Sequence, residues 1–194
     1  MSNELNTKVV TGKVRFSFVN VFKPRAATEG AEEKYSVTIL LPKTDVTTKA
    51  NIDAAIQAAI SQGMSDKWNG VAPPNVPTPI WDGDGVKADG TVFGPECKGH
   101  WVFTASAKSD FKPEVVDQYC QPILDQSEVY SGMFGRVSVR FFAYAAPGRK
   151  GIGCGLNNLQ KLSEGEPLAG RSTAAEDFGA PATGAINPIT GQPM

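Results

Sequence analysis

The segment from residue 129 to residue 145 constrains the fold most, because its side chains alternate between two chemically different faces. One face is apolar and comprises Met133, Gly135, Val137, Val139, Phe141 and Ala143. The opposite face comprises Phe134, Arg136, Ser138, Arg140, Phe142 and Tyr144. A period of two over this length is typical of a β-strand that turns one face towards a core. The chain must therefore place this strand in a sheet.

Four further segments have the composition of strands, at residues 9–22, 35–41, 99–108 and 151–162. In the first segment we expect two alternating sets, with Val10, Val14, Phe16 and Phe18 pointing one way and Lys13, Arg15 and Ser17 pointing the other. The last segment follows 129–145 after the short sequence APGRKG, which predicts a hairpin. Five strands in a chain of this size predict a mainly β domain, either a small barrel or a sandwich.

One helix is predicted over residues 44–64, where apolar side chains recur at helical spacing. The apolar positions are Ile52, Ile56, Ala59, Ile60 and Met64. Asp45 or Thr47 would cap the N-terminus, and Gly63 lies near the other end. We interpret the stripe as the surface that packs on the sheet. The next segment, residues 69–98, is a long loop rich in Pro, Gly and Asp, and loops of this length are usually functional or disordered.

Charge is divided unevenly along the chain, whose net charge is −1 over 194 residues. Residues 1–163 carry 18 Lys and Arg against 16 Asp and Glu, or +2, whereas residues 164–194 carry one Arg against four acids, or −3. From residue 164 small and polar residues dominate, and they bury too little apolar surface to offset the entropy of ordering. We predict one folded domain at 1–163 and a flexible, mildly acidic tail at 164–194.

The sequence disfavours a membrane protein or a secreted protein. No stretch approaches the roughly 18 apolar residues of a membrane span, and the N-terminus MSNELNTK lacks a signal-peptide core. Three widely spaced cysteines, Cys97, Cys120 and Cys154, are typical of reduced thiols in a cytosol. We therefore expect a cytoplasmic protein with no membrane partner. The sequence leaves open whether the chain forms a homo-oligomer.

Aromatic and arginine side chains alternate on the polar face of segment 129–145, at Arg136, Arg140, Phe142 and Tyr144. Aromatic rings stack on unpaired bases for about 1–3 kcal/mol each, and guanidinium groups neutralise phosphates. We predict that this face binds single-stranded nucleic acid, supported by neighbouring cations at Lys13, Arg15, Arg149 and Lys150. The alternative is a face covered by the helix or the long loop, with the arginines at its rim.

Two turns repeat this combination of aromatic and cation. Phe111 lies between Lys108 and Lys112, and Phe22 is followed by Lys23 and Arg25. We predict that these clusters extend the nucleic-acid surface at the strand ends. Two further stacking candidates are Trp81 and Trp101, although Trp101 shares a strand face with Phe103 and is equally consistent with a core position.

Catalytic and metal-binding patterns are weak in this chain. His100 is the single histidine, and neither a Walker loop nor a GxGxxG motif occurs. Cys97 and His100 have zinc-ligand spacing, with Cys120 and Cys154 as remote candidates. We predict no enzyme, no metal and no cofactor, and keep a zinc site as an alternative.

The sequence DGDGVKAD at residues 82–89 is similar to a calcium loop, but Val86 stands where an oxygen ligand belongs and the closing Glu is missing. We interpret Asp82, Asp84 and Asp89 as turn formers. A metal-dependent nuclease that uses these three carboxylates is the alternative.

Five motifs run in order along the chain: WDGDG at 81–85, KPEVVD at 112–117, YSGMFGRVSVRFFAY at 130–144, GIGCGLNNLQKLSEGEPLAGR at 151–171 and AAEDF at 174–178. In these motifs the chain resembles a family of phage-encoded single-stranded DNA-binding proteins that was long filed as a domain of unknown function. The resemblance implies a five-stranded OB-type β-barrel that binds single-stranded DNA without sequence preference. It also implies a role in phage DNA replication, recombination or repair, and a mobile C-terminal tail.

The resemblance also bears on the tail. Related binding proteins end on an acidic tail with an aromatic residue that docks on phage or host replication proteins. Here the matching residues are Glu176, Asp177 and Phe178, and 16 residues follow them. An alternative function is a phage structural or assembly protein whose aromatic and arginine face binds protein.

Overall fold

The computed structural model describes residues 6–168. The tail residues Glu176, Asp177 and Phe178, with the rest of the chain from residue 169, lie outside the described residues. The elements are β1 (Lys8–Val10), β2 (Val14–Ala26), β3 (Glu33–Pro42), α1 (Val46–Asp66), β4 (Trp81–Asp82), η1 (Pro95–Cys97), β5 (His100–Lys108), β6 (Glu114–Val116), η2 (Gln126–Glu128), β7 (Phe134–Ala146) and β8 (Arg149–Ser163).

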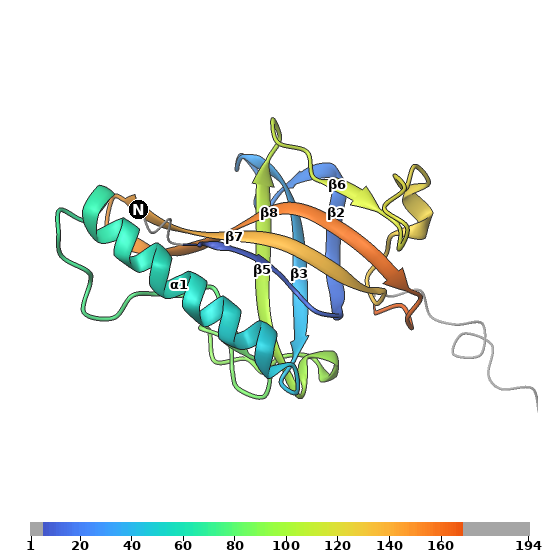
Figure 1. Cartoon of the computed structure of the whole chain (residues 1–194), viewed down its shortest axis with the longest axis horizontal. Helices are drawn as coiled ribbons and strands as arrows, with labels where there is room; N and C mark the ends of the chain where they lie inside the picture. Colours follow the sequence, from blue (N-terminus) through green and yellow to red (C-terminus); the bar gives the residue numbers. More distant parts are fainter. Residues whose placement is uncertain (1–5, 169–194) are drawn as a thin grey trace, which may run out of the picture.

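Five strands close into a barrel in the order β2-β3-β5-β8-β7, because β7 pairs with both β8 and β2 (Figure 1). β5 and β8 are parallel, and the other neighbours in the barrel are antiparallel. This is the strand order of an OB-fold, so the predicted OB-type barrel is confirmed. The short strands β1, β4 and β6 extend the barrel along β7, β5 and β8 respectively.

The apolar face of β7 lies in the core as predicted: Val137, Val139 and Phe141 are buried. They pack with residues from every other barrel strand, including Phe16, Ile39, Phe103 and Leu159. The prediction for the first strand was partly wrong. Val10 and Phe18 are 50% and 71% exposed, because the strand breaks between β1 and β2 and again at an irregularity after Ser17.

The helix α1 begins as predicted, since the Asp45 carboxylate accepts a hydrogen bond from the Thr48 amide at 3.0 Å. It packs on β7 and β1, which confirms that its apolar stripe serves the fold (Figure 1). Met64 is 36% exposed, so its predicted place in the stripe was wrong. Gly63 takes the contact instead, and a Cβ there would overlap Ala143. No helix in the described part of the chain is long and apolar enough to cross a membrane.

The long loop is fastened to the barrel by its WDGDG motif. The Lys43 ammonium donates hydrogen bonds to the carboxylates of Asp82 and Asp84 at 2.6 and 2.7 Å. The Asp84 carboxylate also accepts the Gly99 amide at 3.1 Å. Gly83 lies so close to the η1 turn that a Cβ would overlap the carbonyl oxygen of that turn's last residue. We call this set of contacts the Lys43 clasp.

The Lys43 clasp engages two of the three aspartates of this segment. The positive charge between Asp82 and Asp84 is an ammonium group, with which both carboxylates are paired. Asp89 points elsewhere and accepts hydrogen bonds from the amide and hydroxyl of Thr91 at 3.0 and 2.6 Å. The three aspartates therefore act as turn formers, in agreement with the first interpretation.

The four candidate zinc ligands do not come together in one group. Cys97 is buried in an apolar cluster with Leu40 and Val102, while the His100 ring nitrogen Nδ1 lies 2.7 Å from the carbonyl oxygen two residues earlier. Cys154 is buried and Cys120 is exposed, and all three thiols are free. Within residues 6–168 no group of three or more His, Cys, Asp or Glu side chains could hold a metal ion.

The first residues of the predicted tail contact the barrel. Arg15 donates a hydrogen bond through Nη2 to the carbonyl oxygen of Glu166 at 2.6 Å. The Leu168 amide donates to the Ser131 carbonyl at 3.0 Å, and the Leu168 side chain packs against the cluster around Leu40. Residues 164–168 therefore lie along the body of the domain.

Replacing Lys43 with Met should loosen the long loop while the barrel stays folded, because Asp82 and Asp84 lose their shared donor. We expect faster hydrogen–deuterium exchange at the Gly83 and Gly99 amides, which bond the His100 carbonyl and the Asp84 carboxylate. The wild type should show the same loosening at low pH. Lys43 holds the pKa of both carboxyls below 3.8, so the clasp is complete above that pH and is lost as the pH falls through the lowered pKa values.

Lys49→Met is the matched control for this experiment. Its ammonium lies 4.6 Å from the centre of the Trp101 ring, as that of Lys43 does at 4.9 Å, but it pairs with Asp53 on its own helix. Unchanged exchange in K43M, or an equal increase in K49M, would show that the clasp does not anchor the loop.

Candidate nucleic-acid interface

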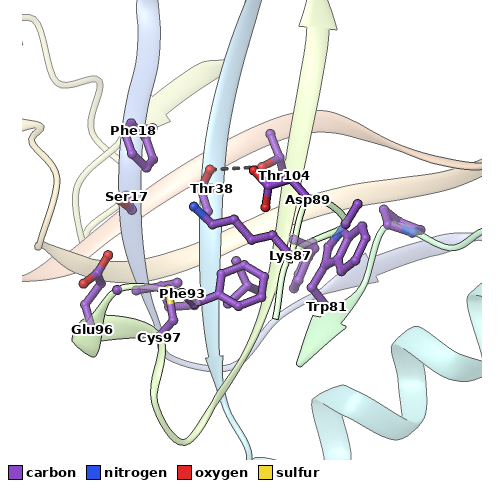
Figure 2. Close-up of a pocket in the computed structure, with 16 residues that line it drawn as sticks. Ser17, Phe18, Thr38, Trp81, Lys87, Asp89, Phe93, Glu96, Cys97 and Thr104 are labelled. Atoms are coloured by element: carbon purple, nitrogen blue, oxygen red, sulfur yellow. Dashed lines mark hydrogen bonds between the residues drawn. The ribbon is translucent and has the colours of Figure 1, made fainter. Parts of the chain in front are cut away.

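A groove of about 630 Å³ lies on the outer face of β2, β3 and β5, between these strands and the long loop (Figure 2). Its floor is apolar and includes Leu40 and Val102. Three aromatic side chains, Phe18, Trp81 and Phe93, come from β2, β4 and the loop. The groove therefore offers several ring surfaces from different elements above an apolar floor.

Phe18 reaches the groove because the backbone of β2 is irregular. Its φ of 47° is left-handed, which is costly for an L-residue that is not Gly or Asn. The pairing with β3 shifts between Ser17 and Asn20, so Ser17 is buried while Phe18 is 71% exposed. Irregularities of this kind re-aim side chains, and strain is retained mainly where function requires it. The backbone thus turns a ring out of the core and into the groove.

The other two rings are held by the fastened loop. Trp81 is 42% exposed and pairs with Val102 in the β4–β5 ladder. The next residue, Asp82, belongs to the Lys43 clasp. Phe93 is half-buried against Leu40, and the Lys87 ammonium lies 5.7 Å from the centre of its ring. Asp89 and Glu96 also line this part of the groove. The lower part of the groove is thus mixed in charge and rich in rings.

A row of polar side chains continues along β3 and β5 from the groove. The hydroxyls of Thr38 and Thr104 are hydrogen-bonded at 3.0 Å, and Ser36 lies opposite Ser106 on the same face. Beyond them three cations form a line across three strands, because Lys34 is the register partner of both Arg25 on β2 and Lys108 on β5. We call Arg25, Lys34 and Lys108 the cation row.

The structure places the predicted site residues of β7 on the other side of the barrel. Phe142 is 46% exposed but lies over Gly153 of β8, and the hydroxyl of Tyr144 would contact a Cβ at Gly151. Arg136 is exposed and donates through Nε to the Thr11 carbonyl at 3.1 Å. These side chains remain partly accessible, yet they are already engaged in cross-strand packing.

Four predicted cations lie at the margins of this second face. The Lys13 ammonium and the Arg15 guanidinium lie 5.0 and 5.5 Å from the ring centre of Phe134. Arg15 also holds the chain after β8 through the hydrogen bond to residue 166. Arg149 and Lys150 are exposed in the β7–β8 hairpin and do not line the groove.

The remaining predicted residues fall into three places. Arg140, Phe111 and Lys112 are brought together in one depression on the β7–β8 side. Lys23 is exposed near the end of β2. Trp101 is partly buried against the main core and lies beneath two lysine ammonium groups.

Sequence reasoning missed Phe18, Phe93, Lys34 and Lys87. Phe18 was expected on the same side as Val14 and Phe16, because a regular alternation gave no sign of the irregularity after Ser17. Lys34 joins the cation row only through pairing between strands that are distant in sequence. The signal for Phe93 and Lys87 was their position in a long loop, where binding residues are common.

Comparison with known proteins places the chain among phage proteins. It is 28% identical over 180 residues to "Putative protein p50" of Acyrthosiphon pisum secondary endosymbiont phage 1, covering 88% of this chain and 92% of the relative. A solved structure of the single-stranded DNA-binding protein from bacteriophage Enc34 in complex with ssDNA has a TM-score of 0.69 and 27% identity. That match covers 84% of this chain and 90% of the other.

The fold is shared more widely than the sequence. The single-stranded DNA-binding protein gp2.5 of bacteriophage T7 matches with a TM-score of 0.60 at 12% identity, over 93% of this chain and 98% of gp2.5. The family model described as the ssDNA-binding protein of Enterobacter phage Enc34 matches residues 7–186. The chain therefore belongs to the family of the Enc34 single-stranded DNA-binding protein.

Proposed function

We propose that this chain binds single-stranded DNA without sequence preference during phage DNA replication, recombination or repair, and that it does so along the outer face of β2, β3 and β5. The observation that carries the proposal is the continuity of one surface. A groove with three aromatic side chains runs through a strip of hydroxyls into the cation row. Family membership favours this function over a structural or assembly protein.

The chemistry of the surface suits unpaired nucleotides. Bases can stack on Phe18, Trp81 and Phe93, and each stacked base contributes about 1–3 kcal/mol. The hydroxyls of Thr38 and Thr104 can hydrogen-bond to bases or sugars, and the cation row can neutralise phosphates. Every base presents an aromatic face, so stacking tolerates any sequence. Paired bases already stack on one another, so a duplex cannot use these rings.

Charge placement explains how a chain of net charge −1 can bind a polyanion. The Coulomb interaction is screened over about 8–10 Å at physiological salt, so local charge matters more than the total. Arg25 and Lys108 are exposed at the end of the strip, and Lys34 lies between them. Asp89 and Glu96 line the groove, and the Glu32 carboxylate lies 3.9 Å from the Lys34 ammonium.

We propose that the chain binds single-stranded DNA and catalyses no reaction. The family is one of single-stranded DNA-binding proteins, and an Enc34 protein of this family has been solved in complex with ssDNA, which supports single-stranded DNA as the partner. We propose action in the cytoplasm of the infected bacterial cell. Docking of phage or host replication proteins on residues 176–178 remains part of the proposal.

Removing the cation row should weaken DNA binding and its salt dependence together. We expect R25Q/K34Q/K108Q to bind oligo-dT less tightly, because up to three phosphate contacts are lost. The slope of log affinity against log salt should fall by about 2, from a loss of about 0.7 per contact. Fluorescence anisotropy of a labelled oligonucleotide at several salt concentrations measures both effects.

A control of equal charge is K67Q/R149Q/K150Q. Its three exposed cations lie directly after the C-terminal end of α1 and at the start of β8, in the β7–β8 hairpin. This variant should keep the wild-type slope. If both triple variants lose affinity equally, net charge and not the cation row governs binding. Absence of saturable binding by the wild type at low salt would overturn the proposed function.

Replacing Phe18 with Gly should separate folding from binding. Glycine adopts a positive φ without strain, so the melting temperature should stay equal or rise. Loss of the ring should lower oligo-dT affinity by roughly 5- to 150-fold, equivalent to about 1–3 kcal/mol for one stacked base. Thermal unfolding and an anisotropy titration provide the two measurements.

Phe142→Ala is the comparison variant, because Phe142 is the exposed aromatic of the β7 face. If F142A weakens binding while F18G binds as the wild type does, the DNA lies on the β7 face. The assignment of the groove would then be wrong.

A further inference from the structure

A second basic surface lies on the side of the barrel opposite the groove. A depression of about 430 Å³ is lined by Lys8, Phe111, Lys112, Arg140, Leu156, Asn157 and Asn158. These residues come from β1, β7, β8 and the turn between β5 and β6. β7 and β8 pass in front of β3 and β5 in Figure 1. The groove is lined by residues of β2, β3, β5 and the long loop, and by none of β7 or β8.

All charged side chains that line the depression are positive. Its lining contains three cations, two amides, an aromatic ring and a leucine, and no carboxylate. None of the ion pairs found among the described residues uses Lys8, Lys112 or Arg140. In a chain of net charge −1, three cations that share a hollow without acidic neighbours in its lining point to an anionic ligand.

The strand register leaves space for that ligand. Arg140 is the partner of Lys8 on β1 and of Gly155 on β8, so both cations project from one face. A Cβ at Gly155 would make only ordinary contacts, the nearest at 3.5 Å to the Arg140 carbonyl oxygen. The glycine therefore leaves the surface beside Arg140 open where a larger residue would fill it.

The turn at residues 109–113 joins this depression to the cation row. Lys108, the last member of the row, accepts a hydrogen bond at its carbonyl from the Phe111 amide at 2.9 Å. The Phe111 ring is 70% exposed at the corner between the two surfaces, and Lys112 follows it into the depression. Phe111 and Lys112 thus link the two surfaces through one turn, in which the exposed Asp110 is the only acidic residue.

We propose that single-stranded DNA leaving the groove bends round this end of the barrel, over Lys108 and Phe111, and continues into the depression. A base stacks on Phe111 at the corner, and Lys8, Lys112 and Arg140 contact successive phosphates. The proposal rests on the proposed function of the groove and extends its length. A short strand fills the groove alone, and a longer strand also uses the second surface.

Oligonucleotide length tests the path directly. The variant K8Q/K112Q/R140Q alters three exposed side chains and should fold as the wild type does. With oligo-dT of about 5 nucleotides, near the lower end of OB-fold site sizes, we expect unchanged affinity. With oligo-dT of about 16 nucleotides, affinity at about 0.1 M salt should fall roughly 10- to 100-fold and the salt slope should fall by about 2.

The control is again K67Q/R149Q/K150Q, which removes the same charge away from both surfaces and should bind both lengths normally. A second readout is F111W, whose indole should be quenched by the long oligonucleotide and not by the short one. The proposal is overturned if K8Q/K112Q/R140Q binds the long strand as tightly as the wild type. It is also overturned if the variant loses the short strand equally, because the depression would then belong to the primary site.

These outcomes separate the path from the function of the groove. Normal binding of the short strand by every variant of the depression supports the groove, whichever result the long strand gives. The groove is also supported if F18G or R25Q/K34Q/K108Q loses affinity for the short oligonucleotide while the variants of the depression keep it. If the wild type binds neither length, the proposed function and the path fail together.

Discussion

The whole structure depends on the double pairing of β7, which bonds to β8 along its length and to β2 at its start. Without the short contact between β7 and β2, the sheet would remain open and its free edges exposed. Closure buries the apolar side of β7 and leaves most polar side chains of the barrel strands facing outward. The resulting cylinder has two separate outer surfaces, one on β2, β3 and β5 and one on β7 and β8. Both surfaces of the proposed DNA path are therefore products of one closed core.

The two surfaces differ in how their rings are presented. On the β7 side, Phe142 covers Gly153, so its ring already makes contacts in the absence of DNA. In the groove, Phe18 stands out from the strand, and the loop that carries Trp81 is held by Lys43. A binding surface gains affinity when its groups are positioned beforehand, because less ordering entropy is then lost on binding. This is the physical reason for preferring the groove as the primary site.

The barrel was predictable because its signals are local. The alternation in β7, the cap at Asp45 and the apolar stripe of α1 are all visible within short windows of sequence. The groove that we propose as the primary site was not predictable, since it depends on distant pairing and on departures from regularity. Arg25 and Lys108 were recognised as separate clusters, but Lys34 unites them only through strand register. The exposure of Phe18 follows from a break in alternation that a run of Phe, Ser and Phe conceals.

Phe18 also has an evolutionary consequence. A left-handed backbone at this position disfavours every residue except Gly and Asn, so folding alone offers no reason to keep a phenylalanine there. Random drift should replace the ring with glycine unless selection for its exposed surface opposes the change. Phage lineages that retain an aromatic side chain at this point of the barrel should be those that still need it for binding. In lineages that have glycine at this position, another residue should provide the surface on which a base stacks.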